Sequence, residues 1–171
     1  FLKKNAVDVD DCYRAVKLCN KIGISAWGSF ILGSPEEDVN DIVATINFIE
    51  NSGLNGAGVY IACPYPGTYL YLLYKEKKYI KENITWADYV VGEYDNVRAI
   101  IRNNYFSSEQ LTEINIYINN YITHFLNNGE DLPGLNHYKE INNILKNRTI
   151  WTKEKTYWKI KYFFNRILKK I

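Results

Sequence analysis

Apolar residues recur along the first third of the chain with two different spacings, which predict a helix followed by a strand. Residues 8–22 have the spacing of an amphipathic helix, with apolar side chains at i, i+4 and i+7: Cys12, Val16 and Cys19. Asp8 or Asp10 can cap this helix, and Gly23 can end it. Residues 24–32 carry no charge and are bounded by glycines, which is typical of a strand buried on two faces.

A second helix and a second strand follow at the spacing of a β-α-β unit. Ser34, Pro35 and Glu37 match a capping box with proline at the first helical position, and the helix should end at residues 51–53. Residues 58–63 form the second charge-free strand, so parallel strands with a right-handed crossover are expected. A short helix capped by Thr68 comes next. This order of elements predicts an α/β fold.

The pattern weakens after residue 80, where irregular or edge-strand structure is expected up to residue 101. Ser107 with Gln110 forms another capping box and opens a helix to about residue 127. A loop at residues 129–133 and helices at 138–145 and 155–171 complete the prediction. We therefore expect a boundary near Phe106, between a body of residues 1–106 and a helical extension of residues 107–171.

Ligands of parallel sheets collect at the carboxyl ends of the strands, which here means residues 33–37 and 63–68. Alternation along the first strand divides its side chains between two faces. The face that is a candidate for lining a cavity carries Ser25, Trp27, Ser29 and Ile31, and the face expected to pack on helices carries Ala26, Gly28, Phe30 and Leu32.

Two segments that end these strands resemble motifs of the radical S-adenosylmethionine (SAM) superfamily. Residues 30–37, Phe-Ile-Leu-Gly-Ser-Pro-Glu-Glu, with Thr45-Ile46 and Phe48-Ile49 after them, resemble a strand ending in Gly-x-Pro-Gly-Glu-Thr and a helix carrying Thr-Ile-x-Phe. Residues 60–71, Tyr-Ile-Ala-Cys-Pro-Tyr-Pro-Gly-Thr-Tyr-Leu-Tyr, resemble the family's Thr-Pro-Tyr-Pro-Gly-Thr-x-Leu-Tyr segment. The pair of motifs is most similar to the branch with an N-terminal cobalamin-binding domain.

This resemblance implies the C-terminal β/α units of a partial, TIM-like (β/α)6 barrel, followed by a mostly helical extension. It implies an enzyme whose [4Fe-4S] cluster cleaves SAM to a 5′-deoxyadenosyl radical, with a cobalamin-dependent methyltransferase or a cyclase as the reaction classes. The adenine of SAM would lie against residues from both strand ends, which are Ile31, Leu32, Gly33, Ala62, Cys63, Pro64 and Tyr65. Candidates for the wall of the substrate chamber are Trp27, Ser29 and Tyr60. Glu37 would cap the following helix.

The chain departs from the family pattern at Glu36, Asp38 and Cys63, where Gly, Thr and Thr are usual. It has no C-x-x-x-C-x-x-C loop, so the cluster ligands are expected outside this segment, no metal ligand is assigned within it, and the segment alone should be inactive. No catalytic residue is named. The chain begins at Phe1 and has no methionine, from which we expect a fragment of a longer protein.

Several of these residues also have simpler interpretations. Trp27, Tyr60 and Tyr65 could equally be core aromatic residues, and Cys63 is better explained as a small buried side chain than as a reactive thiol. Glu36, Glu37 and Asp38 are better explained by the helix N-terminus, which attracts acids, than by a metal site. The two histidines, His124 and His137, have no metal-ligand spacing around them.

The composition of the 171 residues, 47% hydrophobic and 23% charged, is that of a globular domain. No apolar run is long enough to span a membrane, and nothing resembles a signal peptide. The three cysteines are odd in number and form no C-x-x-C pair, which indicates neither a disulfide framework nor a zinc site. A cytoplasmic location fits best, and it could be peripheral to the inner face of the membrane.

The net charge of +2 divides into −6 for residues 1–135 and +8 for residues 136–171. Residues 153–171 form a basic amphipathic segment. Docking on the body is the favoured interpretation, peripheral contact with an anionic membrane is second, and nucleic acid is not expected. The substrate would be a small or lipid-like molecule. Two alternatives stay open: a non-catalytic half-barrel scaffold that recruits a partner or a membrane through this segment, and an unrelated α/β domain.

Overall fold

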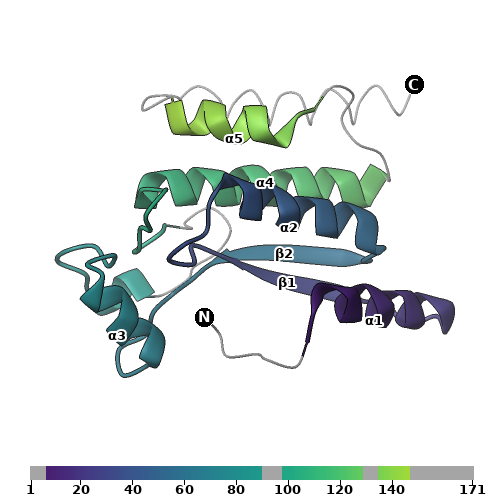
Figure 1. Cartoon of the computed structure of the whole chain (residues 1–171), viewed down its shortest axis with the longest axis horizontal. Coiled ribbons are helices and arrows are strands. Elements are labelled where there is room, and N and C mark those ends of the chain that lie inside the picture. Colours follow the sequence, from purple (N-terminus) through teal and green to yellow (C-terminus); the bar gives the residue numbers. More distant parts are fainter. Residues whose placement is uncertain (1–6, 90–97, 129–134, 147–171) are drawn as a thin grey trace.

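The computed structural model describes residues 7–89, 98–128 and 135–146 of the chain. These residues form an α/β fold with a two-stranded parallel sheet (Figure 1). In chain order the elements are α1 (Val9–Lys21), β1 (Trp27–Leu32), α2 (Val39–Ser52), β2 (Gly56–Ile61), α3 (Tyr69–Glu76), the 3₁₀ helix η1 (Trp86–Tyr89), α4 (Ser108–Asn128) and α5 (His137–Lys146).

The two strands pair directly in parallel, with α2 as the crossover between them. Their register runs from Trp27 opposite Gly56 to Leu32 opposite Ile61, which confirms the predicted parallel β-α-β order. β1 begins three residues later than predicted, because the preceding residues are bonded elsewhere. The N–H of Ile24 bonds the carbonyl of Cys19 in α1, and the N–H of Ala26 bonds the side chain of Asn55.

Most predicted helix ends are confirmed, because they depend on local hydrogen bonds. Asp8 caps α1 in a capping box with Asp11, and Thr68 caps α3. The hydroxyl of Ser107 accepts the N–H of Gln110, whose side chain accepts the N–H of Ser107, so α4 begins as predicted. These caps satisfy N–H groups that would otherwise have no partner inside the helix.

The predicted start of α2 is wrong. Ser34 does not cap this helix, and Pro35 and Glu37 lie in a turn that precedes it. Asp38 is the N-cap instead: its carboxylate accepts the N–H groups of Asn40 and Asp41, and the Asp41 carboxylate accepts the N–H of Asp38 in return. The physical reason lies in Glu37, whose buried carboxylate accepts the N–H of Gly33, four residues earlier, and so faces away from the helix.

The hydrophobic core lies between one face of the sheet and the helices α2 and α4, with α5 packed on the outer side of both (Figure 1). Leu32 of β1 and Val59 of β2 are buried in this core. The fully buried side chains that α2, α4 and α5 contribute to this core are Ile42, Ile46, Ile49, Leu111, Ile114, Ile118, Ile122 and Ile141. Within the described ranges, no helix has both the length and the apolar character to cross a membrane.

Two asparagines of α4 occupy the outer edge of β2. The side-chain oxygen of Asn119 accepts the N–H of Val59 at 3.0 Å, and its amide group donates to the Val59 carbonyl at 2.8 Å. Asn115 donates to the same carbonyl at 2.7 Å. The amide of Asn119 thereby makes the two bonds that the peptide of a neighbouring strand would make, and β2 is covered at this edge by a helix.

A polar cluster joins α5 to the helices beneath it. The ring of His137 lies 2.9 Å from the carboxylate of Glu50 through Nε2 and 2.8 Å from the hydroxyl of Tyr117 through Nδ1. The hydroxyl of Tyr121 donates to the same carboxylate. All four side chains are at least partly buried, so His137 has a structural role that agrees with the expectation of an ordinary histidine.

The segment after α3 forms a short antiparallel bridge in which Ile80 lies opposite Ile101, as the expected edge-strand character allows. The loop predicted at residues 129–133 lies outside the described residues, and so does the basic segment 153–171 with its predicted helix 155–171. The division of the chain near Phe106 stays a prediction.

Candidate functional site

The sheet has one covered face and one open face, and the open face carries the predicted chamber residues. Trp27 is 77% exposed, Ile31 is 54% exposed and Tyr60 is 53% exposed, while Ser29 between them is exposed as well. The alternation predicted for β1 is therefore confirmed. The expectation that both faces of β1 would be buried is wrong for the described residues, since only the face of Phe30 and Leu32 packs on helices.

Two glycines of β2 allow the aromatic rings on this face to lie close to the sheet. Gly56 is paired with Trp27, and a Cβ atom at Gly56 would lie 2.6 Å from the indole ring. A Cβ atom at Gly58 would lie 3.0 Å from the hydroxyl oxygen of Tyr60. Side chains at these positions would displace both rings. The open face is thus a flat surface of two aromatic rings, with Ile31 beside Tyr60 in the register.

The remaining predicted residues lie at the carboxyl ends of the strands but differ in accessibility. The N–H of Ala62 continues the ladder by donating to the carbonyl of Leu32 at 2.8 Å. The side chain of Leu32 is fully buried, and Ala62 and Pro64 are buried too. Only Ile31 and Tyr65 present exposed side chains, with Cys63 half-buried between them in the chain. The structure brings both predicted segments to one end of the sheet.

The turn after β1 is fixed on both sides of Gly33, which has a φ of +95°. Its N–H donates to the carboxylate of Glu37 at 2.5 Å, and its carbonyl accepts the hydroxyl of Tyr74 at 2.5 Å. Burial is the main cause that raises the pKa of Glu37 to about 7, while the hydrogen bond from Gly33 opposes the rise. Burial also raises the pKa of Tyr74, so its hydroxyl keeps its proton and donates.

Asn103, which lies in the segment before α4, holds the same turn. Its amide group donates to the carbonyls of Ser34 and Glu37 at 2.8 and 2.9 Å, and its side-chain oxygen accepts the N–H groups of Tyr105 and Phe106. The side chain is 5% exposed and makes all four bonds of which an amide is capable. The strand-end turn is therefore locked to the segment that leads into α4.

Three aromatic residues gather beyond the end of β2, of which Tyr65 and Trp86 are exposed and Tyr89 is partly buried. The rings of Tyr65 and Tyr89 are stacked with their centroids 5.8 Å apart, and Trp86 lies 5.7 Å from Tyr89. Burial raises the pKa of the Cys63 thiol, which a hydrogen bond with Tyr65 partly offsets. A thiol with a raised pKa is a weak nucleophile at neutral pH, which supports the structural interpretation of Cys63.

The described residues do not fit an iron–sulfur cluster. Cys12 and Cys19 lie on α1, while Cys63 follows β2, and no group of three or more His, Cys, Asp or Glu side chains in the described part of the chain could hold a metal ion. The open face suits an apolar or aromatic ligand better than a metal cluster, because it presents two aromatic rings, the side chain of Ile31 and the hydroxyl of Ser29.

Sequence reasoning missed four residues of this region: Tyr74, Tyr89, Trp86 and Asn103. Asn103 carried one usable signal, because an asparagine pair shortly before a helix is typical of a turn that bonds its own backbone. The other three have no local signal, because their partners lie 24 or more residues away or belong to an irregular segment.

No protein-family model matches the chain. A search of curated proteins finds an uncharacterized methyltransferase of Pyrococcus horikoshii that is 33% identical over 110 residues, which are 63% of this chain and 23% of that protein. The chain thus spans about a quarter of the length of this relative.

Proposed function

We propose that the chain is the C-terminal part of a radical SAM enzyme, with methyl transfer as its reaction class. The observation that carries the proposal is the position of the two family-like segments: they lie at the carboxyl ends of two adjacent parallel strands, beside an open face of aromatic and apolar side chains. The methyltransferase name of the Pyrococcus relative supports the same class. In this proposal β1 and β2 are the last strands of a partial (β/α)6 barrel.

Each group at the strand ends has a role in this proposal. Ile31 would contact the adenine of SAM, with Cys63 and Tyr65 beside it, while Leu32, Ala62 and Pro64 would shape the site through their backbone. Gly33 would form a rigid edge of the adenine site, because its N–H and carbonyl are already bonded to Glu37 and Tyr74. When bound, SAM would supply the methyl group or the 5′-deoxyadenosyl radical.

The open face would be one wall of the substrate chamber. The rings of Trp27 and Tyr60 would exclude water from a small or lipid-like substrate, and Ser29 would offer the hydroxyl between them. Since the described cysteines do not fit a cluster, the [4Fe-4S] ligands and any cobalamin domain would belong to other parts of a longer protein. We place the enzyme in the cytoplasm, with residues 153–171 docking on the body or touching the membrane surface.

SAM binding by the intact parent protein tests the role of Ile31. Ile31→Glu should weaken binding at least about tenfold, because it places a charge against an apolar adenine face. Ile24→Glu is a matched control, since Ile24 is also 54% exposed but precedes β1 at the opposite end. Equal loss in both variants, or no loss in Ile31→Glu, would contradict the assignment.

Electron paramagnetic resonance of the anaerobically reconstituted and reduced parent protein tests the reaction class. A [4Fe-4S]⁺ signal that changes when SAM is added is the expected result. A folded parent protein that assembles no cluster would overturn the proposal and favour the non-catalytic scaffold.

A further inference from the structure

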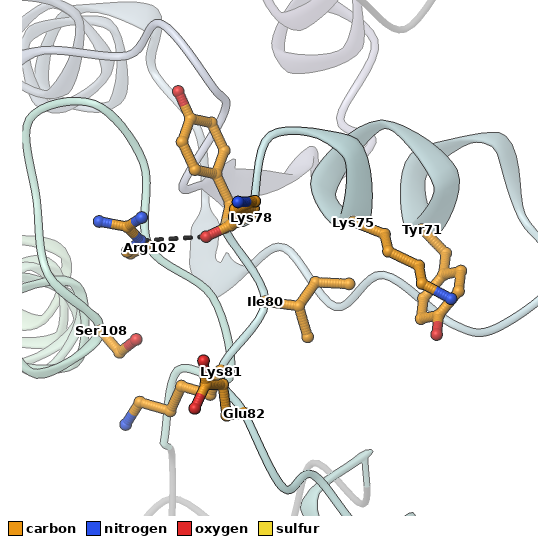
Figure 2. Close-up of a pocket in the computed structure, with 9 residues that line it drawn as sticks. Tyr71, Lys75, Lys78, Ile80, Lys81, Glu82, Arg102 and Ser108 are labelled. Atoms are coloured by element: carbon orange, nitrogen blue, oxygen red, sulfur yellow. Dashed lines mark hydrogen bonds between the residues drawn. The ribbon is translucent and has the colours of Figure 1, made fainter.

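A hollow lies between α3 and the start of α4. It has a volume of about 570 Å³ and is lined by α3, residues 78–82, Arg102 and Ser108. Figure 2 shows Lys75 and Tyr71 on one side, Arg102 and Ser108 on the other, and Ile80 between them. The volume lies within the range of pockets that hold small molecules, roughly 300–1,000 Å³.

The lining of this pocket is strongly basic. Four of its residues are cations, namely Lys75, Lys78, Lys81 and Arg102, and Glu82 is its one acid. Lys81 is paired with Glu109 at 2.9 Å. Among the residues that the structure describes, no carboxylate lies within ion-pair distance of Lys75, Lys78 or Arg102. The pocket therefore has an excess of positive charge that its own side chains leave uncompensated.

Arg102 is held in place without using the groups that would bind an anion. Its Nε donates to the carbonyl of Lys78 at 3.2 Å, and its guanidinium lies 5.9 Å from the ring centre of Tyr79. Lys78 itself has a φ of +55°, a backbone conformation that is uncommon for lysine. The terminal amino groups of Arg102 have no partner in the described part of the chain, and a guanidinium presents them as a planar fork.

Ser108 adds a hydroxyl group to the lining of this pocket. The residue is 4% exposed, its hydroxyl group points toward the pocket in Figure 2, and it makes no hydrogen bond to any described residue. Ser108 is also the first residue of the 21-residue helix α4, whose N-terminus favours negative charge.

We propose that this pocket binds the phosphate group of a phosphorylated small molecule. Arg102 would form bidentate hydrogen bonds to the phosphate oxygens, Lys78 and Lys75 would balance its charge, and the Ser108 hydroxyl would donate to it. A phosphate matches the site better than a single carboxylate, because it brings up to two charges and more acceptor oxygens to three cations that no described carboxylate pairs. The remaining volume accommodates the rest of the molecule along Tyr71.

Calorimetric titration of the intact protein with inorganic pyrophosphate tests the proposal, with succinate as a dicarboxylate for comparison. Saturable, salt-sensitive binding of pyrophosphate is expected. Arg102→Gln should weaken it about tenfold or more, the loss expected for a hydrogen bond to a charged group. Ser108→Ala should weaken it about threefold or more, and because this hydroxyl bonds no described residue, the variant should fold normally. Lys139→Gln, an exposed lysine of α5, is the control and should bind like the wild type.

Loss of binding in a folded Ser108→Ala variant, with normal binding by Lys139→Gln, would establish the site independently of any effect of Arg102 on folding. The proposal is overturned if pyrophosphate does not bind saturably, if succinate binds as tightly, or if the control weakens as much as the pocket variants. None of these outcomes depends on SAM binding or on a cluster.

Discussion

The buried carboxyl group of Glu37 should make the protein less stable as the pH rises. Glu37 is 9% exposed, and burial is the main cause that raises its pKa from 4.5 to about 7. The unfolded chain releases the same proton near the ordinary value. Between these two pH values the folded protein therefore holds the proton more tightly than the unfolded chain does. The resulting stability is fully present below about pH 4.5 and is lost as the pH rises through about 7.

The magnitude follows from the separation of the two pKa values. One pH unit is worth about 1.4 kcal/mol, so a rise from 4.5 to about 7 corresponds to about 3 kcal/mol of unfolding free energy. Glu37→Gln removes the ionisation but keeps a side-chain oxygen that can accept the N–H of Gly33. The free energy of unfolding of the variant should therefore be about 3 kcal/mol higher than that of the wild type at pH 8, and the two should agree within about 1 kcal/mol near pH 4.

Urea unfolding followed by circular dichroism, at constant ionic strength and at a series of pH values, measures this difference directly. Comparing variant with wild type cancels the titration of all other groups. Glu36→Gln is the matched control: its carboxylate is 66% exposed and lies 3.2 Å from the Nζ of Lys77. The control should follow the wild-type pH profile. Parallel profiles for Glu37→Gln and the wild type would refute the reasoning.

Two further predictions concern the turn that Glu37 stabilises. Gly33→Ala should cost about 2 kcal/mol more than Gly67→Ala in urea unfolding, because both glycines have positive φ but only at Gly33 would the new Cβ meet another atom, Cδ1 of Ile101 at 2.8 Å; equal costs would contradict this packing. Asn103→Asp should lower the unfolding free energy by about 3 kcal/mol, because a carboxylate cannot donate to the carbonyls of Ser34 and Glu37. Asn142→Asp, at an exposed position of α5, serves as its control. A similar loss of unfolding free energy in both variants would argue against the role of Asn103 in holding the turn.

Helix ends were predictable because a cap is a local structure. Asp8, Thr68 and Ser107 each bond an N–H group three residues further along the chain, and the pattern of residue types within that distance is sufficient to recognise them. Gly53 ends α2 in the left-handed conformation for an equally local reason.

The turn at residues 33–37 could not be predicted from such patterns. Ser34, Pro35 and Glu37 satisfy the spacing of a capping box, but contacts distant in sequence decide the structure. Asn103 donates to the carbonyls of Ser34 and Glu37, which precede it by 69 and 66 positions in the chain. The hydroxyl of Tyr74 donates to the carbonyl of Gly33, which precedes it by 41 positions. Once these bonds hold the turn, Glu37 faces Gly33, and Asp38 is the next side chain able to cap α2.

The candidate site was predicted in part. Alternation along β1 correctly separated Trp27, Ser29 and Ile31 from Phe30 and Leu32, because side-chain direction in a strand is fixed by the backbone. The absence of charge suggested burial on both faces, yet one face is open in the described residues. An apolar strand looks the same in sequence whether its second face is covered by helices of the same segment or faces another part of a larger protein.

The edges of the sheet show on which side that larger structure would be added. At β2 the amide of Asn119 already bonds the N–H and carbonyl of Val59, so another strand could not pair there without displacing α4. At β1 no described strand lies on the outer side. An unpaired edge next to an exposed apolar face is a site at which proteins associate or aggregate unless it is covered. In the proposed barrel, further strands would therefore pair with β1, and β2 would be the last strand of the sheet.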